Sequence, residues 1–152
     1  MTELLAPESK STSTATATVS KILCVDDEQN ILSSLRRLFR PLGYEMFLVT
    51  SAAEGLQVLE TQPIDLIISD MRMPQMDGAE FLKQVAQRWP GTVRILLTGY
   101  SDLQSTVTAI NQGHIYRYVS KPWEDNDLKL AVQHALATKF LTEEQVRLQA
   151  LT

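Results

Sequence analysis

The stretch of sequence that decides the fold reads Ile64-Asp65-Leu66-Ile67-Ile68-Ser69-Asp70-Met71-Arg72-Met73-Pro74-Gln75-Met76-Asp77-Gly78. Its apolar run, residues 66–68, is typical of a strand that is buried on both faces of a sheet. The strand ends in the carboxylate of Asp70, and Pro74 and Gly78 mark the turn-rich loop that follows. A buried carboxylate without a partner loses solvation worth on the order of several kcal/mol. We therefore expect Asp70 to meet a cation, to bind a phosphate or to take part in chemistry.

Strand-like and helix-like patterns alternate along the rest of the chain. Short apolar or β-branched runs predict strands at 22–25, 46–49, 66–70, 93–98 and 115–119. Helical spacing begins near residues 31, 51, 78, 101 and 125. The alternation predicts an α/β fold with a five-stranded parallel sheet, doubly wound and flavodoxin-like, (βα)5. The first, third and fourth strands are continuously apolar and suit the centre, whereas Glu45 and Arg117 suit the edges, so the expected strand order is 2-1-3-4-5.

Polar side chains follow these strands along one edge of the predicted sheet, in the order Asp26, Asp27, Asp70, Thr98 and Lys121. Ligands of such sheets bind at the switch point between the first and third strands. Carboxylates about 4 Å apart repel by roughly 4 kcal/mol at an effective dielectric of about 20, and a hard cation such as Mg²⁺ relieves the repulsion. Either of the first two acids alone could simply cap a helix. With a hydroxyl and an ammonium group beside them, the set indicates phosphoryl transfer to a carboxylate.

Four motifs fall on four of the strand ends: Ile22-Leu23-Cys24-Val25-Asp26-Asp27-Glu28, Asp70-Met71-Arg72-Met73-Pro74-Gln75-Met76-Asp77-Gly78, Leu96-Leu97-Thr98-Gly99-Tyr100 and Tyr118-Val119-Ser120-Lys121-Pro122. In order and spacing they resemble the receiver domain of two-component response regulators, the CheY-like superfamily. The resemblance covers about residues 20–138.

The resemblance implies a phosphoacceptor and a metal site. Asp70 would take the phosphoryl group from a phosphohistidine of a sensor histidine kinase or a histidine phosphotransfer protein. Asp27, Asp70 and the backbone carbonyl of Arg72 would bind Mg²⁺ directly, and Asp26 would hold the ion through water.

The resemblance also implies a switch. Lys121 would pair with the phosphoryl group, and its bond to Pro122 is expected to be cis. Thr98 would move toward the phosphoryl group, and Tyr118 would rotate inward behind it. The surface that changes would consist of the fourth helix, the fifth strand and the fifth helix, and a homodimer could form through this surface or through the C-terminal helix.

The two ends of the chain differ from its middle. Residues 1–19 are rich in Ser, Thr and Ala and are expected to form a flexible tail. Residues 20–138 would be the receiver domain. Beyond them, Leu141, Leu148 and Leu151 continue at heptad-like spacing, so residues 139–152 are expected to form a helical extension or a linker to an output domain.

Composition excludes several classes of protein. The 152 residues carry a net charge of −4, which argues against direct binding of nucleic acid. No apolar run approaches the roughly 18 residues that span a bilayer, and no signal pattern opens the chain, so we expect a cytoplasmic protein with no membrane partner. Cys24 lies in an apolar run and is expected to be a buried free thiol.

Other functions are possible for such a fold. A phosphatase of the haloacid-dehalogenase type would need a second acid two residues after Asp70, where Arg72 stands. A flavin-binding module would bring its phosphate against three carboxylates. The motifs around Thr98 and Lys121 also resemble receivers attached to cyclic-di-GMP phosphodiesterases or cyclases and to hybrid kinases. We expect a regulatory phosphoacceptor, not an enzyme, in which Arg72 and Tyr100 slow hydrolysis by crowding the attacking water.

Overall fold

The computed structural model describes residues 19–99, 102–112 and 114–150, so the expected tail, residues 1–19, lies almost wholly outside the described residues. In chain order the elements are β2 (Lys21–Val25), α2 (Gln29–Phe39), the 3-10 turn η1 (Arg40–Leu42), β3 (Glu45–Val49), α3 (Ala52–Thr61), β4 (Leu66–Asp70), α4 (Gly78–Arg88), β5 (Val93–Thr98), α5 (Leu103–Asn111), β6 (Arg117–Ser120) and α6 (Asp125–Ala150).

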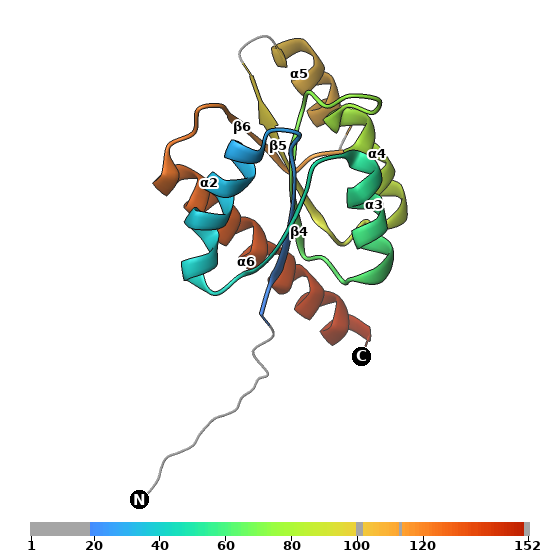
Figure 1. The fold of residues 1–152 in the computed structure, drawn as a ribbon. Coiled ribbons are helices and arrows are strands. Elements are labelled where there is room, and N and C mark those ends of the chain that lie inside the picture. The colour runs from blue at the N-terminus through green and yellow to red at the C-terminus, as the bar shows by residue number, and fades with distance from the viewer. Residues whose placement is uncertain (1–18, 100–101, 113, 151–152) are drawn as a thin grey trace, which may run out of the picture.

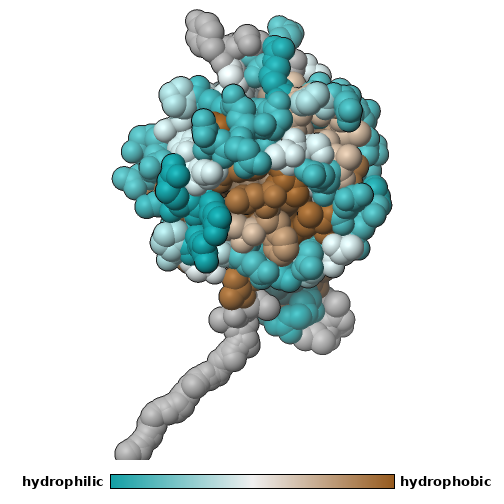
Figure 2. All heavy atoms as spheres, in the orientation of Figure 1, coloured by the Kyte–Doolittle hydropathy of each residue, from teal (hydrophilic) through white to brown (hydrophobic). Residues whose placement is uncertain are grey.

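The five strands form one parallel sheet in the order β3-β2-β4-β5-β6. This is the predicted 2-1-3-4-5 order, and the predicted fold class is confirmed. The central strands β2 and β4 are almost completely buried, whereas the edge strands β3 and β6 are half-buried or exposed. Figure 2 shows the molecule in the orientation of Figure 1, and apolar side chains gather near the middle of this face. In Figure 1 the strands of the sheet lie at the same place.

Helices cover both faces of the sheet (Figure 1). On one face α2 and α6 pack against Ile22, Leu66 and Ile95. On the other face α3, α4 and α5 pack against Leu23 and Ile67. Side chains of alternate residues along each strand therefore enter two separate apolar layers, as expected of a sheet that is buried on both sides.

The start of the fifth strand differs from the predicted one by two residues. The strand begins at Arg117 and not at 115, and Ile115, which precedes it, packs into the core. The last helix continues without interruption from Asp125 to Ala150, so the residues of the expected helical extension beyond 138 that the structure describes continue the same helix. Among the described residues, no helix has both the length and the apolar character needed to cross a membrane.

Candidate functional site

Three carboxylates meet at the carboxyl edge of the sheet. Strands β2 and β4 pair in register, with Val25 opposite Ser69, so the residues that follow these two lie side by side. One carboxylate oxygen from each of Asp26, Asp27 and Asp70 lies within 4.8 Å of the others. Asp26 and Asp70 are buried, whereas Asp27 is exposed. The predicted convergence of the three acids is present in the fold.

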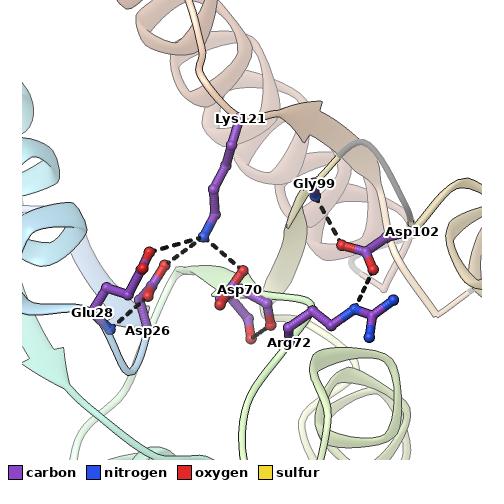
Figure 3. A network of polar contacts seen from close by, with 8 residues as sticks. Asp26, Glu28, Asp70, Arg72, Gly99, Asp102 and Lys121 are labelled. Carbon is purple, nitrogen blue, oxygen red and sulfur yellow. Dashed lines mark hydrogen bonds and ion pairs between the residues drawn. The ribbon is translucent and has the colours of Figure 1, made fainter.

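Lys121 reaches into this cluster from the loop after β6 (Figure 3). Its Nζ lies 2.8 Å from Oδ1 of Asp70, 3.2 Å from Oδ2 of Asp26 and 3.9 Å from Oε1 of Glu28. The peptide bond between Lys121 and Pro122 is cis, as expected. One ammonium group thus bridges two buried carboxylates, one directly after β2 and one at the end of β4.

Burial shifts the pKa values of Asp26 and Asp70. Desolvation raises the pKa of Asp26 to about 6, against the hydrogen bond that its Oδ1 accepts from the Glu28 amide at 2.9 Å. Burial also raises the pKa of Asp70, which the hydrogen bond from Lys121 only partly offsets. Burial acts to lower the pKa of Lys121, but its bonds to the two acids raise that pKa above the ordinary value. A single cation therefore leaves these carboxylates short of positive charge.

This donor set fits a hard divalent cation. All the ligand atoms are carboxylate oxygens, two of them from buried residues, and Asp27 keeps one side of the cluster open to water. Mg²⁺ binds proteins through a few carboxylates and retains several of its waters. The three acids would hold such an ion, and its two positive charges would supply what Lys121 alone does not.

Thr98 and Tyr118 lie on the same side of the sheet. Thr98 ends β5 and is buried, and its carbonyl accepts a hydrogen bond from the Lys121 amide at 2.8 Å. Tyr118 lies opposite Leu96 on the edge strand β6, and its side chain is 43% exposed. The fold thus brings Thr98 to the border of the acidic cluster and leaves Tyr118 at the outer edge of the sheet.

An ion pair that sequence reasoning missed lies next to the cluster (Figure 3). Nε of Arg72 lies 2.5 Å from Oδ1 of Asp102, and the Gly99 amide donates to Oδ2 of the same carboxylate at 2.9 Å. Burial acts to raise the pKa of Asp102, but these hydrogen bonds hold that pKa below its usual range. The sequence had indicated a role only for the backbone carbonyl of Arg72 and for crowding by its side chain. Tyr100, expected to crowd with it, lies outside the described residues.

Comparison with known proteins agrees with this geometry. The sequence model of the response regulator receiver domain family matches residues 22–133 of the chain. The hydrogenase transcriptional regulatory protein HoxA of Cupriavidus necator is 38% identical over 84% of this chain and 26% of its own length. The chain spans about a quarter of the length of the curated relatives it matches.

Two solved structures resemble the whole fold. The signal receiver domain of an HD domain-containing protein from Pseudomonas fluorescens is 44% identical, with a TM-score of 0.78, and the match covers 81% of this chain and 98% of that one. An adenylate cyclase structure from Rhodopirellula baltica is 30% identical, with a TM-score of 0.81, and the match covers 89% and 100% of the two chains. With its five-stranded parallel sheet and its acidic cluster at the switch point, the chain belongs to the response regulator receiver domain family.

Proposed function

We propose that the protein is a phosphorylatable switch in which Asp70 accepts a phosphoryl group from a phosphohistidine. The donor would be a sensor histidine kinase or a histidine phosphotransfer protein. One observation carries the proposal: the Lys121 ammonium group lies 2.8 Å from a buried Asp70 carboxylate that shares its edge of the sheet with two other acids. A nucleophilic oxygen, a cation for phosphate oxygens and a metal-binding donor set are thereby assembled at one place.

The transfer itself needs no acid or base on this chain. A carboxylate oxygen of Asp70 forms a bond to phosphorus as the bond between phosphorus and the histidine nitrogen breaks. The electron pair of that bond stays with the nitrogen, and the donor leaves as neutral imidazole because its other ring nitrogen carries a proton. Lys121 would neutralise charge on the phosphoryl oxygens while it remains near Asp26. Mg²⁺, held by Asp26, Asp27, Asp70 and the Arg72 carbonyl, would supply further positive charge to those oxygens.

The signal would leave through the surface formed by α5, β6 and α6. Phosphorylation replaces the single negative charge of the Asp70 carboxylate with a phosphoryl group that carries about two. Thr98 would move toward those charges from the end of β5, and Tyr118 would rotate inward from its exposed position. A shift of populations from 1:99 to 99:1 requires about 5.5 kcal/mol of differential stabilisation, which a new dianion beside a buried cluster can supply.

The alternatives have less support. Arg72 stands where a phosphatase of the haloacid-dehalogenase type needs its second acid. The curated relative HoxA is a transcriptional regulatory protein, which does not favour a fragment of a cyclic-di-GMP enzyme. We infer a regulatory phosphoacceptor that is not an enzyme and that loses its phosphoryl group slowly.

The test is uptake of phosphate from acetyl phosphate in the presence of Mg²⁺, measured by intact-protein mass. The unchanged chain should gain at most one phosphoryl group, and Asp70→Asn should gain none. Asp127→Asn is the matched control, because this acid is exposed on α6 and is not one of the three clustered acids, and uptake should persist. Uptake by Asp70→Asn would contradict the proposal, and repeated turnover of a phosphomonoester would favour a phosphatase.

A further inference from the structure

Arg72 and Asp102 join the two loops that flank Asp70 and Thr98. Arg72 follows β4 by two residues, and Asp102 lies immediately before α5. Their side chains meet at 2.5 Å across the gap between the loops (Figure 3). The pair therefore links the loop of the proposed phosphoacceptor to the loop of the proposed switch hydroxyl.

The two partners differ sharply in exposure. The Asp102 side chain is 3% exposed, whereas that of Arg72 is 70% exposed. The buried carboxylate is anchored by the Gly99 amide, which follows Thr98 directly. Asp102 is thus the fixed partner, and the Arg72 guanidinium is the partner that is free to move.

The guanidinium borders the acidic cluster. Asp27, Arg72 and Asp102 line one hollow of about 480 Å³ in the surface. A phosphoryl group on Asp70, whose cluster includes Asp27, would bring about two negative charges beside this hollow, against the single charge of Asp102. Guanidinium binds phosphate oxygens through two parallel hydrogen bonds, so the phosphoryl group is the stronger competitor.

We propose that the Arg72 guanidinium exchanges Asp102 for the phosphoryl group on Asp70. The proposal rests on the function proposed above. In the exchange, Asp102 loses its cationic partner but keeps the hydrogen bond from the Gly99 amide, so the ion pair that links the Asp70 loop to the residue after Thr98 is broken. Once transferred, the Arg72 guanidinium covers the phosphoryl group and slows attack by water.

The test is the lifetime of the phosphorylated chain in Asp102→Asn, Arg72→Ala and the double variant. Asp102→Asn keeps the shape and the acceptor for the Gly99 amide but removes the charge that holds Arg72 back. Its phosphoryl lifetime should lengthen by about fivefold, the rate change that corresponds to roughly 1 kcal/mol. Arg72→Ala should shorten the lifetime, and in that background Asp102→Asn should have no further effect.

A control and the contrary outcomes make the test specific. Glu60→Gln breaks an exposed ion pair with Arg88 of 2.9 Å and should leave the lifetime unchanged. An unchanged or shorter lifetime in Asp102→Asn, or an effect that persists without Arg72, overturns the exchange, because a purely structural pair would not couple the two lifetimes. An equal or longer lifetime in Arg72→Ala also overturns the exchange, whether or not Asp102→Asn folds, because the guanidinium would then not cover the phosphoryl group. Failure of the unchanged chain to take up phosphate would instead reject the proposed function itself.

Discussion

At the scale of single residues, the position of Asp70 depends on a glycine eight residues later. The amide of Gly78 donates to the Met71 carbonyl at 2.8 Å, which folds the loop after β4 back on itself. A Cβ atom at Gly78 would lie 2.1 Å from the backbone oxygen of Asp70 and 3.0 Å from Cδ1 of Leu96. The Asp70 backbone and the Leu96 side chain lie too close to residue 78 for any residue larger than glycine. The close packing at Gly78 therefore helps to fix the position of Asp70.

Gly78→Ala should therefore lower the free energy of unfolding by about 1–3 kcal/mol, because the added Cβ would clash with the backbone of Asp70, which cannot shift without strain. Gly91→Ala is the matched control, since no atom lies within 4 Å of a Cβ at Gly91 and its effect should stay within about 0.5 kcal/mol. Urea unfolding measures both changes. Equal midpoints for the two variants would show that the loop adapts.

At the scale of elements, α6 has two different halves. On one side Leu128, Val132 and Leu136 enter the core with α2. Beyond them the helix is held to the start of β4 by Lys139, whose Nζ lies 3.7 Å from Oδ1 of Asp65 and also pairs with Glu143. The remaining turns are exposed. The C-terminal extension thus continues a core helix. Lys139 holds the start of the extension against the sheet, and its last turns are exposed.

The exposed face of α6 should pair with a second copy of the chain. Leu130, Leu141 and Leu148 are exposed and are eleven and seven residues apart, close to three and two helical turns, so they form one stripe. Light scattering should give a mass of about two chains for the unchanged protein and one for the variant with both Leu141→Ser and Leu148→Ser.

Val146→Ser is the control for this pairing. Val146 is comparably exposed but lies five residues from Leu141, on another side of the helix, so its replacement should leave the mass unchanged. The same mass for chains with and without residues 139–152 would count against pairing through the helix.

At the scale of the whole molecule, the site exists only in the folded sheet. Asp26 and Lys121 are 95 residues apart in sequence yet form one hydrogen bond. Asp26 follows β2 and Asp70 ends β4, two strands that become neighbours through a crossover. A cation that binds these acids together therefore binds the folded chain and not the unfolded one, and its binding free energy adds to stability.

Mg²⁺ should raise the free energy of unfolding, by about 2.7 kcal/mol at a concentration one hundred times its dissociation constant. Asp27→Asn should abolish most of this gain without unfolding the protein, because Asp27 is exposed. Thermal unfolding at matched ionic strength, with Glu60→Gln as control, measures the effect. The same gain in Asp27→Asn would exclude this acid as a ligand, and removal of the metal by a chelator should reverse the gain in the unchanged chain.

The sequence by itself determined the fold class, the strand order and the edge of the sheet at which the acids meet. Apolar periodicity is local, and a parallel sheet places every strand end that carries an acid at the same edge. The meeting of Asp26, Asp27, Asp70, Thr98 and Lys121 at one edge could therefore be predicted before any contact was known, and their role as site residues stays a prediction.

Only the tertiary structure decided how these residues are held. Arg72 and Asp102 are 30 residues apart, and nothing in the sequence links them beyond an acid at a helix start. The approach of Gly78 to Asp70 and the docking of Lys139 on Asp65 were equally invisible, as was the start of β6 at Arg117. The spacing of apolar residues in the sequence predicts which face of a helix or strand is buried. Which side chains touch across two elements depends on rotamers and packing that the whole chain settles together.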